Sequence, residues 1–198
     1  YEPEFDQMLF YLPLTGSTFK KVYYDELLGR AVSKFIQAED LIVPYTASSL
    51  EDADAIVHVI KISENDLRKQ QVGGFYRDIE LGDPPINENQ VKAKQLELEG
   101  VTANDQQRES MYTLLEVHTD LDLEDYPDVN ENEEPTGIKL PYIITIDETS
   151  QQVLSIRRNY EPEDPLKKKK NYFVQFKFLP GTGFYGFGLI HMIGGLTR

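Results

Sequence analysis

The stretch FLPGTGFYGFGLIHMIGGL, residues 178–196, combines glycines with aromatic and aliphatic side chains and contains no acidic residue and no lysine. Such a run has to be covered, because large exposed apolar patches are unusual on a soluble monomer. Its glycines allow close backbone approach, and its aromatic rings supply large apolar area. We call residues 178–196 the glycine–aromatic segment. We predict that it packs against another surface through Gly181, Gly183, Phe184, Tyr185, Gly186, Phe187, Gly188, Gly194 and Gly195.

The position of this segment in the chain leads to a further expectation. The segment runs almost to the last residue, Arg198, and the chain begins at Tyr1 without a methionine. We therefore expect the chain to be a piece of a longer polypeptide, with the surface that covers the glycine–aromatic segment lying outside it.

Composition excludes several functional classes. A formal net charge of -14 and a pI near 4.6 argue against a surface that grips nucleic acid phosphates, which depends on Lys and Arg. The absence of cysteine excludes disulfides, thiolate zinc sites and a cysteine nucleophile. No apolar run reaches the roughly 18 to 20 residues that a membrane-spanning helix needs. We expect a soluble protein with no membrane partner and no cofactor.

Periodicity predicts a mainly antiparallel α+β fold. Apolar residues at helical spacing from Phe5 to Leu12 indicate a helix before Pro13, and Ser63 with Asp66 three residues later indicates a capped helix ending at Gly73. A third helix is expected at residues 88–99. Period-two patterns, with hairpin turns around Gly29 and at residues 148–150, predict strands at 19–24, 30–37, 41–43, 55–62, 111–121, 139–146, 152–158 and 171–179.

The same patterns suggest an organisation along the chain. Residues 1–81 form a first region of helix, hairpin and capped helix, and residues 82–110 form a polar helical excursion or linker. Residues 111–198 form an antiparallel β region that ends in the glycine–aromatic segment. All three regions together could equally form one domain.

The segment Asp120–Glu134 contains eight carboxylates and no basic residue, and such a segment could hold Ca²⁺ through oxygen ligands. It lacks the EF-hand pattern, and charge runs are usually solvated. Nothing in it offers the apolar pocket that would separate the pKa values of the two catalytic carboxylates of a glycosidase.

The run Lys167–Lys170 is expected to be a solvated hairpin loop between the last two predicted strands. It could also pair with the acidic segment between copies of the chain, which reversing the lysines to glutamates would test.

Other motifs fit enzymes poorly. Gly181, Gly183 and Gly186 match the spacing of a dinucleotide-binding fingerprint after a strand, but no βαβ continuation follows, so packing glycines explain them better. The three histidines are far apart, with no metal-binding spacing; His58 and His118 lie in strand patterns that favour a structural role. No nucleophile, base and orienting group stand at a recognisable spacing, so we expect no enzymatic activity.

Four stretches resemble the portal proteins of short-tailed double-stranded DNA bacteriophages, or of a prophage. They are GSTFKKVYYDELLGRAVSKFIQAEDLIVPY (16–45), IVHVIKISENDLRK (56–69), LPYIITIDETSQQVLSIRRNY (140–160) and FLPGTGFYGFGLIHMIGGLTR (178–198). They occur in the family's order and span nearly the whole chain from first to last, while the polar middle and the acidic segment carry little of the likeness. The last is the most specific, because a generic fold does not need its Gly-Phe-Tyr-Gly-Phe-Gly-Leu pattern followed by Ile-Gly-Gly-Leu.

The resemblance implies an internal, wing-region fragment of a structural subunit. In that family about twelve copies form a closed ring, the head-to-tail connector at the capsid vertex. DNA is packaged and ejected through the ring as passing cargo, without sequence readout. The implied partners are further copies of the subunit, terminase, capsid, scaffold and tail-adaptor proteins. The implied location is the virion, and the host cytoplasm during assembly. The alternative from another class is a Ca²⁺- or carbohydrate-binding module that uses residues 120–134.

Overall fold

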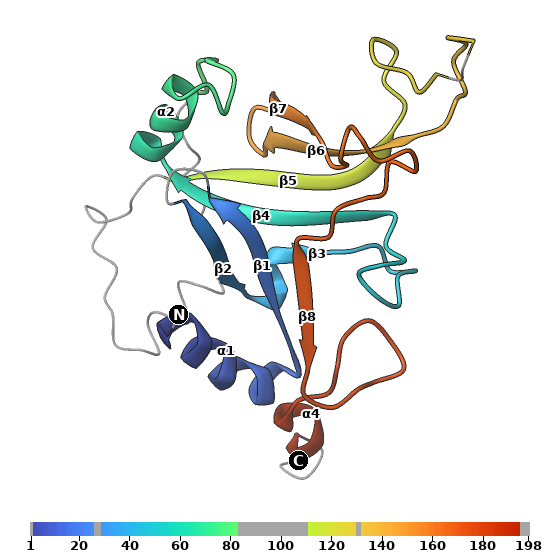
Figure 1. Ribbon diagram of the computed structural model, residues 1–198. Coiled ribbons are helices and arrows are strands. Elements are labelled where there is room, and N and C mark those ends of the chain that lie inside the picture. Colours follow the sequence, from blue (N-terminus) through green and yellow to red (C-terminus); the bar gives the residue numbers. More distant parts are fainter. Residues whose placement is uncertain (1, 26–28, 83–110, 130–131, 195–198) are drawn as a thin grey trace. The chain divides into compact units, whose positions relative to one another are not determined.

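The computed structural model describes residues 2–25, 29–82, 111–129 and 132–194 (Figure 1). The described residues form an α+β structure with a three-stranded and a five-stranded antiparallel sheet and a few short helices, which confirms the predicted fold class. By spatial contacts the chain groups into two compact units. One contains residues 1–58, 117–143 and 157–198, and the other contains residues 59–116 and 144–156. Residues from before and after 83–110 contribute to each unit.

The first unit is built around a three-stranded sheet. The helix α1 (Glu2–Thr15) leads into β1 (Ser17–Asp25) and β2 (Arg30–Ile36), and β8 (Phe173–Lys177) pairs with the other side of β1, giving the order β2-β1-β8. In the β1–β2 hairpin Phe19 lies opposite Ile36, and Gly29 has a φ of +60°, as the predicted hairpin turn requires.

Helix α1 packs on this sheet through three kinds of contact. The Tyr11 ring stacks on Phe35 at 5.8 Å between centroids, and the Lys20 ammonium lies 5.1 Å from the centre of the Phe5 ring. The Glu4 carboxylate accepts a hydrogen bond from the Phe35 backbone N–H at 2.6 Å, which occupies a donor on the edge strand β2. The helix predicted from the spacing of Phe5 to Leu12 is confirmed, and α1 continues through Pro13 to Thr15.

The five-stranded sheet has the order β3-β4-β5-β6-β7. After the 3₁₀ turn η1 (Ala38–Asp40) come β3 (Leu41–Ile42), β4 (Ala55–Ser63), β5 (Met111–Leu121), β6 (Leu140–Asp147) and β7 (Val153–Arg158). The predicted turn between β6 and β7 is confirmed. There the buried Asp147 carboxylate accepts hydrogen bonds from the backbone N–H and the hydroxyl of Ser150, at 2.8 and 2.7 Å.

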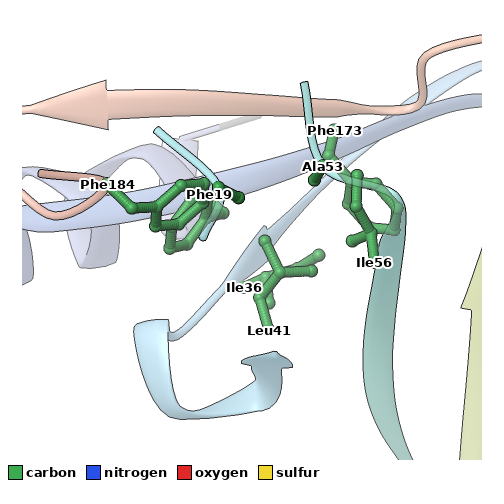
Figure 2. Packing of buried hydrophobic residues seen from close by; sticks show 8 residues of the cluster. Phe19, Ile36, Leu41, Ala53, Ile56, Phe173 and Phe184 are labelled. Atoms are coloured by element: carbon green, nitrogen blue, oxygen red, sulfur yellow. The ribbon is translucent and has the colours of Figure 1, made fainter. Parts of the chain in front are cut away.

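The first unit has its main core on one face of the three-stranded sheet (Figure 2). Phe19 is fully buried there, and the Phe184 ring of the glycine–aromatic segment stacks on it. The loop after β3 and the start of β4 supply further apolar side chains. The buried members of this cluster are Phe19, Ile36, Leu41, Ala47, Ala53, Ile56, Phe173 and Phe184.

The second unit has its own apolar core, to which the helix α2 (Glu64–Val72) contributes Leu67. Helix α2 begins at the predicted cap, where the Ser63 hydroxyl accepts a hydrogen bond from the Asp66 backbone N–H at 3.2 Å. It ends at the predicted glycine pair Gly73–Gly74. The helix predicted at residues 88–99 lies outside the described residues.

The connection between β7 and β8 differs from the prediction. The Lys167–Lys170 run was expected to form a hairpin loop between these two strands, and this is wrong, because β7 and β8 belong to different sheets. Strand β8 pairs instead with β1, with Lys21 opposite Phe173. Local alternation finds a strand but not its partner, since pairing across more than a hundred residues is decided by the shared core.

Candidate contact site at the glycine–aromatic segment

The glycine–aromatic segment leaves β8 and folds back on itself. Leu179 and Phe187 form an isolated antiparallel bridge, with N–H to oxygen distances of 3.3 and 2.8 Å in the two directions. Within the loop that this bridge closes, the Phe184 carbonyl oxygen accepts a hydrogen bond from the Gln175 side chain at 2.7 Å. The Gly183 carbonyl oxygen accepts one from the Lys177 ammonium at 3.3 Å. Strand β8 therefore holds the loop by its side chains as well as by the chain itself.

Three glycines let the backbone of this segment lie in direct contact with the backbone of the turn between α1 and β1. Gly16 has a φ of +85°, and a Cβ there would lie 2.4 Å from the Gly188 nitrogen. A Cβ on Gly188 would lie 2.4 Å from the Leu14 carbonyl oxygen, and one on Gly186 would lie 2.6 Å from the Gly16 carbonyl oxygen. The Gly186 N–H donates to the buried Ser17 hydroxyl at 2.7 Å. We call this arrangement of Gly16, Gly186 and Gly188 the glycine crossing; a side chain at any of the three would push the two segments apart.

The other predicted glycines have different surroundings. A Cβ on Gly181 would lie 3.0 Å from the Phe187 ring, whereas nothing lies within 4 Å of a Cβ on Gly183. Gly194 ends the last helix, and Gly195 lies outside the described residues. Close packing inside this chain therefore explains Gly186 and Gly188 fully, Gly181 in part and Gly183 not at all.

The three aromatic residues predicted as contacts lie in different environments. Phe184 is buried, with its ring centroid 5.8 Å from that of Phe19 and the two rings nearly parallel. Tyr185 and Phe187 remain about half exposed, at 47 % and 50 %. Partial burial raises the pKa of the Tyr185 hydroxyl above its ordinary value. Within this chain Phe184 is an anchor, and burial of the other two by a partner stays a prediction.

A short helix, α4 (Leu189–Ile193), completes the described part of the segment. The Gly188 N–H that precedes it donates to the His191 ring nitrogen Nδ1 at 3.1 Å. The same imidazole packs against the Phe187 ring in a T-shaped arrangement. Helix α4 contacts α1 and has no buried residue. The apolar side chains of α4 therefore extend the half-exposed surface that Tyr185 and Phe187 begin.

The acidic segment and the lysine run meet within one chain. Lys167 forms an ion pair with Asp128, whose side chain is only 12 % exposed. Asp128 also accepts a hydrogen bond from the Thr136 hydroxyl at 2.7 Å. The hydrogen bond from Lys167, and then that from Thr136, hold the pKa of the Asp128 carboxyl below its ordinary value. Pairing of these two segments between copies was the hypothesis, and for these residues the contact is intramolecular instead.

Two more lysines of the run have partners in the same unit. The Lys169 ammonium donates to the Ala53 carbonyl oxygen at 3.2 Å, and Lys170 forms an ion pair with Glu161, whose hydrogen bond raises the pKa of Lys170. A small pocket beside the run has room for about one water molecule. We call the contacts of Lys167 with Asp128 and of Lys169 with Ala53 the lysine clasp.

The remaining motifs fit structural roles. The buried His118 and the His58 ring both face the Phe173 ring edge-on, at centroid distances of 4.9 and 5.8 Å. Among the described residues no group of His, Cys, Asp or Glu is arranged to hold a metal ion. The predicted contact residues were read from the segment itself, so Gly16 and Ser17 were missed as its partners. The sequence Thr15-Gly16-Ser17, which is typical of a turn after a helix, was the feature that could have pointed to them.

Comparison with known proteins adds no family. No protein-family model matches the chain, and a search of the curated proteins gives no match either. In the part of the chain that the structure describes, no helix is both long enough and apolar enough to cross a membrane.

Proposed function

We propose that this chain is a structural segment, from the wing region, of a phage portal subunit, which forms a ring at the capsid vertex for the passage of DNA. The proposal rests on the resemblance of four stretches of the sequence to that family. The observation that supports it best is the glycine–aromatic segment, which is held in place on one side and apolar on the other. The glycine crossing and Phe184 fix the segment to the first unit. The side chains of Tyr185, Phe187 and helix α4 remain partly exposed to solvent.

This arrangement suits the assembly of subunits better than it suits the catalysis of a reaction. An apolar surface that is rigidly mounted can bind a protein partner without first losing conformational entropy. A chain of net charge -14 also suits the surroundings of a DNA conduit, where phosphates should pass without sticking. The partners in this proposal are further copies of the subunit, with terminase, capsid, scaffold and tail-adaptor proteins as in the family that the sequence resembles.

Ring assembly of the intact subunit tests the proposal. Purified wild-type subunit should form closed rings that are visible by negative-stain electron microscopy and measurable by light scattering. The variant Phe187→Ser should assemble poorly, whereas Phe75→Ser, at a similarly exposed ring in the second unit, should assemble normally. An intact wild-type subunit that stays monomeric would refute the portal function. Rings of normal yield from Phe187→Ser would leave the function standing and remove the segment from the assembly contact.

A further inference from the structure

Two adjoining helices of the first unit present apolar side chains that none of the residues described by the structure covers. The second half of helix α1 contributes exposed apolar side chains, of which Phe10 is 67 % exposed. Helix α4 lies beside the C-terminal end of α1 (Figure 1). Gly188 at the start of α4 packs on the Leu14 carbonyl oxygen. We use the name α1–α4 surface for the exposed apolar side chains of these two helices together with Phe187, which precedes α4: Leu9, Phe10, Leu14, Phe187, Leu189, Ile190, Met192 and Ile193, each at least 37 % exposed.

The α1–α4 surface is also where the chain carries least charge. Residues 7–19 and 178–197 contain no Asp, Glu, Lys or Arg, although the chain as a whole has a net charge of -14. Two copies of so acidic a chain repel each other over most approaches, because like charges on facing surfaces are costly. The repulsion is smallest where the contact residues are neutral. An uncharged apolar patch is moreover complementary to itself, since it has no hydrogen-bonding groups to match.

We infer that the α1–α4 surface is the contact through which one copy of this chain binds a second copy. Its composition is that of a permanent interface between identical subunits, in which aromatic residues and Met are enriched and charged residues are depleted. Phe10, Phe187 and Met192 are the large side chains of this kind on it. The inference rests on the proposed function in that it names which surface joins the copies of an assembling subunit.

A lipid bilayer is the other occupant that apolar helices suggest, and the charge pattern disfavours it. Helices that lie on membranes carry Lys and Arg on their polar face, and these residues attract the anionic lipids of the membrane surface. Helix α1 instead carries Glu4 and Asp6 in its first half and no Lys or Arg, and helix α4 carries neither.

Matched charge insertions test the contact in this chain as it stands. Ile190 lies on the α1–α4 surface and Ile138 lies off it, and both isoleucines are 57 % exposed. We expect Ile190→Asp and Phe10→Asp to weaken self-association at least about tenfold in sedimentation equilibrium, while Ile138→Asp leaves it unchanged. Far-ultraviolet circular dichroism, which reports the backbone fold, should be the same for all three, because each replaced side chain is mostly exposed. Equal self-association of Ile190→Asp, Phe10→Asp and wild type would overturn the inference, as would a wild-type chain that stays monomeric at every concentration.

Disulfide trapping gives an independent measurement, because the chain contains no cysteine and every cross-link comes from the introduced residues. Phe10→Cys and Ile190→Cys, alone and mixed, should yield cross-linked dimers under mild oxidation, whereas Ile138→Cys should not. Cross-links only in the mixture indicate head-to-tail contact, as a ring requires, and cross-links within one variant indicate a two-fold dimer. A two-fold dimer would keep the inference and count against the portal ring. Cross-linking no greater than for Ile138→Cys, or flotation of the wild type with anionic phosphatidylserine vesicles in place of self-association, would overturn the inference.

Discussion

The glycine crossing and the lysine clasp both join distant segments of the first unit, and they do so by opposite means. At the glycine crossing the two backbones meet because three residues have no side chain. At the lysine clasp, long side chains reach from one loop to an acidic segment and to the loop before β4. The first contact is buried and depends on shape, while the second is partly solvated and depends on charge.

The difference shows where the unit is rigid. A backbone crossing tolerates no added volume, because the atoms it would displace belong to two chain segments that are fixed by hydrogen bonds on both sides. An ion pair near the surface tolerates rearrangement, because water and other polar groups can replace either partner. We therefore expect substitutions at the crossing to cost much more stability than substitutions at the clasp.

The strongest test of this comparison is one substitution at two glycines of the same segment. Gly188→Ala places a Cβ 2.4 Å from the Leu14 carbonyl oxygen, whereas Gly183→Ala places it in open space. We expect Gly188→Ala to lower the free energy of unfolding by about 5 kcal/mol or to prevent folding. Gly183→Ala should be neutral, or stabilise by about 0.5 kcal/mol through the unfolded chain. Urea denaturation followed by circular dichroism measures both, and similar midpoints for the two variants would show that the crossing is not tight.

The next test separates the buried from the exposed aromatic residues of the segment. Phe184→Ala removes a ring that is buried against Phe19, and we expect a loss of about 3 kcal/mol in the free energy of unfolding. Phe187→Ala removes a ring that is half exposed, so its cost in this chain should be below about 1 kcal/mol. Thermal and urea unfolding measure these losses. Equal losses would mean that Phe187 is as much a core residue as Phe184, and would weaken the case for a partner.

The two contacts also differ in how far the sequence alone predicts them. The spacing of glycines and aromatic residues predicted a surface that packs closely, and that surface was expected to lie outside the chain. Gly186, Gly188 and Phe184 pack within the chain instead. The spacing did not reveal that Gly16 lies on the other side of the crossing, since nothing local links residues so far apart in the chain. The strand patterns likewise predicted β7 and β8 but not that they belong to different sheets.

The contacts of the lysine clasp were not predicted from the sequence, for a physical reason. Runs of like charge are solvated in most proteins, so a sequence gives no sign of which carboxylate a lysine will meet. Asp128 is one of eight carboxylates in its segment, and only the fold selects it, by placing Lys167 and Thr136 beside it. The α1–α4 surface was predicted only in part. The pattern near the N-terminus indicated a helix, but it did not indicate which residues of that helix would remain exposed.

The smallest expected effect concerns the lysine clasp and depends on pH. Lys167 and Thr136 lower the pKa of Asp128, so this carboxylate stabilises the fold above its ordinary pKa of 3.8. That contribution is lost as the pH falls through the lower pKa of the folded state. Lys167→Met should raise the Asp128 pKa toward its ordinary value and reduce stability near neutral pH by a small amount. The difference from wild type should shrink at acid pH, where both proteins carry the protonated carboxyl.

Carboxyl NMR titration of Asp128, together with urea midpoints across the acid range, measures this effect. Lys168→Met is the matched control, because it removes the same charge from the same loop and leaves the Lys167–Asp128 contact in place. An Asp128 pKa that responds equally to both substitutions would mean that the general charge of the lysine run acts on this carboxyl. A response to Lys167→Met alone would assign the shift to the direct contact. The clasp would then be a specific fastening within one chain, and its lysines would not be available to join neighbouring copies.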